Sequence, residues 1–217
     1  MTMANCSCES CPSTCLTRSS RRSYLRRIPV SVWVFIAVAI LTLAHDVMDA
    51  RAEVYHSRES AIELAFPGAD SVTTATLMLS ETQAADVAAR AGVTIESRLV
   101  RVYEAWSSGE VTRRGIIDTH KVRSLPETVL VVTDATHRVE AVHLLAFHEP
   151  VQYRASEKWF GQFEDRGLDP ELAVRRGIVG MAGATMTSNA VTAAVRRALA
   201  TLEVGFAAEE TMPTIGK

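Results

Sequence analysis

Two apolar runs near the middle of the chain, residues 128–133 and 139–147, are separated only by the polar stretch 134–138. The first run is rich in β-branched residues, and the stretch between the two runs (DATHR) has the composition of a turn. Strand-like runs joined by a short polar segment are typical of a β-hairpin. This pattern therefore predicts two antiparallel, paired strands at the centre of the chain.

A second turn signal at 107–109 (SSG) separates two further segments of strand composition, 93–106 and 110–120. Pro67-Gly68 and Gly92 are typical of helix ends. Hairpins outnumber strand–helix–strand units, so the sequence predicts a single α+β domain with a largely antiparallel, twisted sheet packed with helices. The remaining expected elements are a strand at 72–79 and helices at 57–66, 81–91, 156–163 and 188–204.

The last expected helix has a continuous apolar face. Val191, Val195, Leu199 and Leu202 recur at three- and four-residue steps, which places them on one side of a helix. We expect this face to pack on the sheet and to fix the loop that precedes the helix.

The first 52 residues differ in kind from the rest. Five arginines between positions 18 and 27 precede residues 30–44, which carry no charge and are almost wholly apolar. Residues 50–52 (ARA) then supply small residues two positions apart, as signal peptidase requires. This layout predicts an export signal cleaved after Ala52. A retained anchor is the alternative, although a spanning helix needs about 20 apolar residues.

Residues 20–26 (SRRSYLR) also resemble a twin-arginine signal, and an ordinary basic segment is the other interpretation. Either signal places the rest of the chain in the periplasm, or at the inner membrane facing it. We therefore divide the chain into an N-terminal extension with its export signal (1–52), a folded domain (53–205) and a flexible tail (206–217), which contains Pro213 and Gly216.

Composition excludes several classes for the exported part. All four cysteines (Cys6, Cys8, Cys11 and Cys15) precede the signal, so the domain contains no disulfide and no thiolate-bound cluster. From residue 53 onward there are 17 basic and 22 acidic residues, a net charge of about −5, which disfavours nucleic acid as a partner. The histidine spacings favour no metal site, and no serine-hydrolase motif occurs.

A run of small and hydroxyl residues precedes the last expected helix: Gly183, Ala184, Thr185, Thr187 and Ser188 lie within GATMTS. Glycine lets a bulky group approach the backbone. The N-terminus of a helix attracts anions, and the hydroxyls at 187 and 188 are suitable helix caps. The sequence thus indicates either a phosphate site or a plain capped loop.

This run resembles the flavinylation motif of the FMN-binding domain family, which includes the covalent-FMN domains of the Rnf and sodium-pumping Nqr redox complexes. The resemblance implies that Thr185 forms a phosphoester with FMN, made by a separate FMN transferase. The chain departs from the motif at Ala182, where the family usually has Ser or Thr.

Weaker similarities to this family occur in other parts of the chain. Residues 147–150 (FHEP) partly match a stretch beside the flavin ring in this family, which implies roles for His148 and Glu149. Residues 159–163 resemble its aromatic stretch, so Trp159 contacts the ring or belongs to a helix core. Lys121 and Arg123 alternate to one face of an extended segment. We expect them either to neutralise a phosphate or the reduced flavin, or to be solvated surface charges.

The resemblance implies an exported flavoprotein that relays electrons between redox partners in or at the membrane. Without a visible acid–base constellation, an electron carrier or a component of a redox complex is favoured over an enzyme with its own substrate. Two alternatives stay open: a component of a flavin-dependent reductase with non-covalent FMN, and a structural or sensory module without cofactor.

Overall fold

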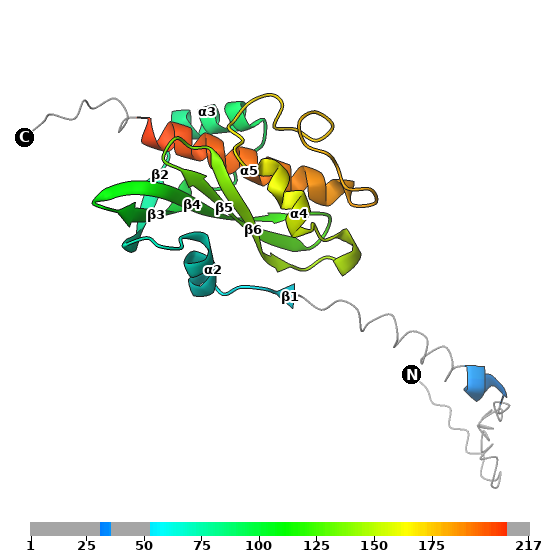
Figure 1. The fold of residues 1–217 in the computed structure, drawn as a ribbon. Coiled ribbons are helices and arrows are strands. Elements are labelled where there is room, and N and C mark those ends of the chain that lie inside the picture. Colours follow the sequence, from blue (N-terminus) through cyan, green and yellow to red (C-terminus); the bar gives the residue numbers. More distant parts are fainter. Residues whose placement is uncertain (1–30, 36–52, 208–217) are drawn as a thin grey trace, which may run out of the picture. The chain divides into compact units, whose positions relative to one another are not determined.

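A computed structural model describes residues 31–35 and 53–207 (Figure 1). The chain divides into two compact units, Met1–Asp46 and Val47–Lys217. In the first unit, residues 31–35 form one helical turn within the apolar run. The rest of the expected export signal and the tail from residue 208 lie outside the described residues.

The second unit is built on one antiparallel sheet with the strand order β1-β6-β5-β4-β3-β2. All five neighbouring pairs are antiparallel, which confirms the predicted α+β class. The strands are β1 (Glu53–Val54), β2 (Ser71–Met78), β3 (Leu99–Ser107), β4 (Glu110–Lys121), β5 (Pro126–Asp134) and β6 (Val139–Phe147).

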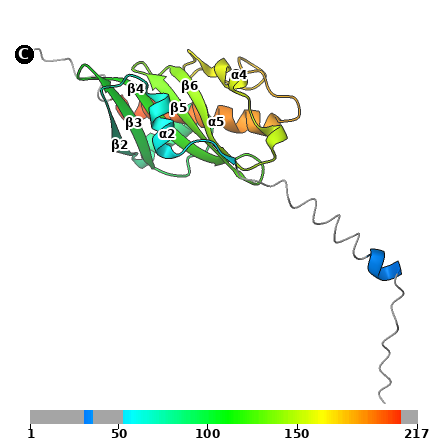
Figure 2. The ribbon, with the colours of Figure 1, turned by 60° about the horizontal axis from the view of Figure 1, so that its bottom comes forward.

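Helices cover both faces of this sheet (Figures 1 and 2). The long helix α5 (Thr185–Phe206) packs on one face with α3 (Glu81–Ala91) beside it, and α2 (Arg58–Ala65) lies on the other. Three short helical segments follow β6: η1 (Val151–Tyr153), α4 (Glu157–Phe160) and η2 (Gly161–Phe163).

Local sequence signals set the ends of the shorter helices. Ser57 caps α2 by accepting the N–H of Ser60. Ser80 and Gln83 form a reciprocal capping box at the start of α3, and Gly92 ends that helix in the left-handed conformation. The sequence predicted these boundaries because capping depends on residues within one turn of the helix end.

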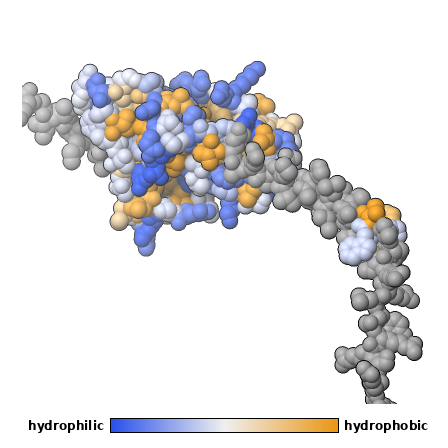
Figure 3. Space-filling model, turned by 90° about the horizontal axis from the view of Figure 1, so that it is seen from below, coloured by the Kyte–Doolittle hydropathy of each residue, from blue (hydrophilic) through white to orange (hydrophobic). Residues whose placement is uncertain are grey.

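The main core lies between the sheet and α5. Val191, Val195, Leu199 and Leu202 are completely buried there, which confirms the predicted apolar face. A second core lies under α2, where Phe66 packs with residues of β3, β5 and β6. Figure 3 shows this α2 face from outside, with apolar residues in small patches among polar ones.

Two predicted element starts differ from the structure by about three residues or more. The strand expected over 93–106 begins only at Leu99, because residues 93–98 form a loop in which Ser97 bonds back to the Leu99 backbone. The last helix begins at Thr185 rather than at 188, and it continues through Phe206, one residue beyond the expected domain end. The apolar pattern could not place its start, since the first turn packs through hydroxyl side chains.

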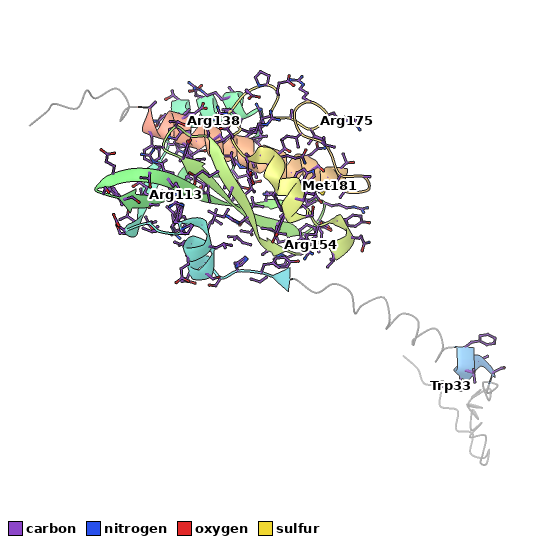
Figure 4. The ribbon with its side chains drawn as sticks, viewed as in Figure 1. Trp33, Arg113, Arg138, Arg154, Arg175 and Met181 are labelled. Carbon is purple, nitrogen blue, oxygen red and sulfur yellow. The ribbon has the colours of Figure 1, made fainter. Side chains whose placement is uncertain are left out.

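A long loop joins η2 to α5 and carries its own buried anchors, Leu172 and Ile178. At its start, Arg138 from the β5–β6 hairpin forms an ion pair with Asp165, with Nε 2.6 Å from Oδ1 (Figure 4). Arg196 of α5 donates to the carbonyl of Asp169 at 2.8 Å and that of Leu172 at 3.1 Å. The loop is therefore bound to the body of the domain before it reaches α5.

Within residues 31–35 and 53–207, no helix is both long and apolar enough to cross a membrane. The same residues contain no cluster of three or more His, Cys, Asp or Glu side chains arranged to hold a metal ion.

The close approach of Gly177 to the loop backbone generates a first prediction. A Cβ at this position would lie 2.6 Å from the carbonyl oxygen of Glu171, a backbone atom that cannot rotate away. We expect Gly177→Ala to lower the free energy of unfolding by about 1–3 kcal/mol, as overpacking does. Gly161→Ala is the control, because its Cβ would meet nothing closer than 3.6 Å. Equal urea midpoints for the two variants would contradict this geometry.

Candidate functional site

The first turn of α5 leaves backbone donors without intrahelical acceptors. Ala184 occupies the N-cap and supplies no side-chain hydrogen bond, and no acidic residue lies in the first turn. Gly183, just before it, has a φ of +79° and open space where a side chain would be. The N–H groups of a first turn and the helix dipole together favour a bound anion at this point.

Two of the three hydroxyl side chains in this turn are buried and fully used. Thr187 donates its hydroxyl to the carbonyl of Tyr153 at 2.8 Å. Ser188 donates to the carbonyl of Ala184 at 3.1 Å and accepts the N–H of Met181 at 2.9 Å. The prediction that they cap the helix is wrong: they lie inside it and fix the loops on either side.

Thr185 differs from both. It is the first residue of α5, it is exposed, and among the described residues its hydroxyl has no hydrogen-bond partner. The turn therefore presents one free hydroxyl beside the open N–H groups. This end of α5 lies beside η1, whose Tyr153 carbonyl accepts the hydroxyl of Thr187, and Figure 4 shows Met181 in the loop that leads to it.

The opposite wall is a tight turn at residues 122–125, between β4 and β5, held by one carboxylate. Oε1 of Glu149 accepts the backbone N–H groups of Arg123, Ser124 and Leu125 at 3.2, 2.7 and 2.8 Å. Burial by itself raises the pKa of Glu149, but these hydrogen bonds outweigh it and hold the pKa below its usual value. Glu149, only 6% exposed, is thus an anion bound to the turn.

These two walls enclose a cavity of about 260 Å³. It brings together six of the predicted site residues: Arg123, Glu149, Gly183, Ala184, Thr185 and Thr187. Arg123 lines this cavity and is exposed to solvent. The cavity therefore combines a cation, a helix N-terminus and the hydroxyl of Thr185. This combination suits a phosphate ester.

Four other predicted residues do not line this cavity. Ser188 lies behind it, and Lys121 lines a different cavity with His120 and Arg197, so the shared face predicted for Lys121 and Arg123 is not found. Nδ1 of His148 lies 3.1 Å from the carbonyl oxygen of Pro126, which holds the ring against β5.

Trp159, the fourth, acts on the cavity indirectly. Its ring is buried in the main core, against Phe163, and its Nε1 donates to the carbonyl of Val179 at 2.7 Å. Gln162 accepts the N–H of the same Val179 at 2.8 Å. The predicted aromatic stretch is therefore core, and it fixes the loop that carries Gly183.

The sequence reasoning missed three lining residues, Val122, Tyr153 and Met186. Tyr153 enters through η1, a single 3-10 turn that follows Pro150, and its carbonyl bonds Thr187. Pro150 was a usable signal for a turn here. Nothing in the sequence could indicate that this turn faces the start of α5.

The contacts of Glu149 generate a second prediction. Glu149→Gln replaces the charge that accepts three N–H groups, so we expect the free energy of unfolding at pH 7 to fall by about 1–3 kcal/mol. Because the folded-state pKa is lowered, this stabilisation is present above the unfolded pKa and is lost as the pH falls through the folded one. The difference from the parent should therefore shrink below about pH 4.

The exposed Glu63 in α2 offers the control for that measurement. Urea unfolding of Glu63→Gln should match the parent at every pH. A Glu149→Gln protein as stable as the Glu63→Gln protein at pH 7 would show that the carboxylate does not hold the turn.

Comparison with known proteins gives one match. Residues 124–200 match the family model of the FMN-binding domain, a stretch that runs from the 122–125 turn to the middle of α5 and includes Glu149 and Thr185. Among curated proteins, none matches the chain. Over residues 124–200 this chain is similar to the FMN-binding domain family, and FMN is the cofactor that this match supports.

Proposed function

We propose that this protein is an exported electron-transfer flavoprotein that carries FMN on Thr185 through a phosphoester. One observation carries the assignment to this residue. Of the three hydroxyls in the first turn of α5, those of Thr187 and Ser188 are buried and bonded, whereas that of Thr185 is exposed and has no hydrogen-bond partner among the described residues. A phosphoester needs a hydroxyl that a separate enzyme can reach.

The residues around Thr185 fit a phosphate. The first-turn N–H groups and Arg123 would hold its oxygens, and the open space at Gly183 leaves room beside the backbone. Ala182, where the family usually has a hydroxyl, is exposed and does not line the cavity. Its lack of a hydroxyl leaves this cradle unchanged.

FMN would supply the redox chemistry, while the protein binds and orients it. The cavity has one carboxylate, Glu149, and that group is bound to the 122–125 turn rather than facing a reacting atom. Such a site holds a cofactor without offering a general acid or base for a second substrate. This favours an electron carrier between redox partners over a stand-alone enzyme.

Attachment would require an FMN transferase that works where the domain folds. The basic and apolar segments before residue 52 support export to the periplasm, with partners in or at the inner membrane. Covalent attachment suits that compartment, because a cofactor that cannot dissociate need not be replaced there.

The third prediction concerns attachment. The protein, co-expressed with an FMN transferase in an exporting host, should gain the mass of FMN less one water, on the peptide that contains Thr185. Thr185→Ala should lose all covalent flavin and remain folded, since the residue is exposed. Thr185→Ser keeps a hydroxyl and should retain the flavin. Covalent flavin on the Thr185→Ala protein would refute the assignment.

The fourth prediction concerns export. The basic run, the apolar core and Ala50-Arg51-Ala52 predict that the exported protein begins at Glu53. N-terminal sequencing of the periplasmic form checks this. An intact N-terminus on protein that resists carbonate washing would instead establish a retained anchor. Replacing Arg21 and Arg22 together by Lys should block export if the twin-arginine route is used.

A further inference from the structure

A row of charged side chains lies in the layer between the sheet and α5. Arg197 of α5 binds Asp118 of β4 through two nitrogens, each 2.7 Å from a carboxylate oxygen. Oδ1 of Asp118 lies 2.9 Å from Nδ1 of His120, and Nε2 of His120 lies 3.3 Å from Oε2 of Glu127 on β5. The row therefore runs from Arg197 at its outer end to Glu127.

Glu127 is the buried end of this row. It is completely inaccessible to solvent, although it is an acid in the main core layer. Among the residues that the structure describes, its Oε1 is the one buried side-chain oxygen or nitrogen without a hydrogen-bond partner. Burying such a group costs free energy, which cores usually avoid. The cost suggests that the carboxyl group has a use beyond packing.

His120 and Glu127 are the two groups of the row that can take up a proton once Arg197 and Asp118 are paired. Arg197 and Asp118 neutralise each other through a bidentate contact. Burial lowers the pKa of His120, but hydrogen bonds to Asp118 and Glu127 outweigh it and the pKa lies above its ordinary value. Burial raises the pKa of Glu127. Both shifts favour the protonated forms of His120 and Glu127, and their side chains are 3.3 Å apart.

Glu127 lies close in the chain and in the sheet to both walls of the cavity that contains Thr185. Glu127 is opposite Phe147 in the sheet, and Glu149 follows Phe147 by two residues. Leu125, whose N–H binds Glu149, precedes Glu127 by two residues. Leu125 lies one residue before β5 and Glu149 two residues after β6, so Glu127 lies at the end of the sheet from which both walls continue.

Protons can reach the pair from the other side. His120, Asp118 and Arg197 line a second cavity of about 260 Å³, formed with residues 94–101. Glu127 lines neither this cavity nor the one at Thr185. His120 is therefore the link between solvent and the buried carboxyl group.

We propose that His120 and Glu127 form a proton-uptake site that responds to negative charge in the flavin cavity. When reduction adds negative charge there, the pair takes one proton from water through His120, so that His120 is cationic and Glu127 neutral. On reoxidation the proton returns to water. The electrons come from the redox partner of the proposed function, on which this inference rests, and the pair itself is neither oxidised nor reduced.

Other charged groups face the pair, and we take their charges as unchanged when the flavin is reduced. Besides Asp118 and Arg197, they are Glu96 of the loop before β3, Arg101 of β3 and Lys121 at the end of β4.

The test compares Glu127→Gln with Glu104→Gln. Glu104 is a matched control: it is a nearly buried acid on β3, paired with Arg114 at 3.3 Å and without a histidine bridge to the cavity. Potentiometric titration of the flavin-loaded domain from about pH 5 to 9, the range in which histidine and raised carboxyl pKa values fall, counts the protons taken up per two electrons. We expect one fewer proton in Glu127→Gln than in the parent over part of this range, and no change in Glu104→Gln.

A second measurement, the titration of His120, does not need the cofactor. In the flavin-free domain, NMR titration should give His120 a pKa above its ordinary value in the parent and in Glu104→Gln, but a lower one in Glu127→Gln. If Glu127→Gln fails to fold, His120→Asn tests the same loss of proton uptake.

Two results would overturn the inference: equal proton counts in the parent and in Glu127→Gln or His120→Asn, or an ordinary His120 titration in the parent. Absence of covalent flavin from the parent would instead count against the proposed function, and the NMR titration would still decide whether the pair shares a proton.

Discussion

The packing of α5 against the sheet is the interaction on which the rest of the structure depends. Val191, Val195 and Leu199 are completely buried between the helix and the central strands. Such burial is the main favourable term in folding, and it fixes the helix axis. Because the axis is fixed, the uncapped first turn of α5 is held facing the turn between β4 and β5. The cavity is thus a consequence of core packing rather than of mobile loops.

Similar side chains have different roles in this site. A short polar run can therefore both fix the neighbouring loops and present a reactive hydroxyl. Thr187 and Ser188 use their hydroxyls to bind the neighbouring loops, whereas Thr185 is exposed and has no such contact within residues 31–35 and 53–207. The two glutamates also differ. Glu149 accepts hydrogen bonds from a turn, whereas Glu127, beside His120, has a buried oxygen without a partner in the described part of the chain. Environment, not residue type, assigns these roles.

Much of the fold could be predicted from local signals. Ser80 and Gly92 bound α3 as expected, and the turn formers between the strands give the β3–β4 and β5–β6 hairpins. The start of α5 was missed because its first turn contains hydroxyls and no apolar pattern. The contact of Tyr153 with Thr187 was also missed, since it joins residues that are far apart in sequence.

The central claim is that the phosphate of FMN lies at the N-terminus of α5, opposite the 122–125 turn. Backbone amide chemical shifts of the flavin-free and flavin-loaded domain test it most directly. The account predicts large downfield shifts for the amide protons of Thr185, Met186 and Thr187 in the loaded form, because the N–H groups of the first turn would donate to the phosphate. Amides of α3, far along the sheet, should not move. Unchanged amides at 185–187 in a flavin-loaded protein would contradict the account.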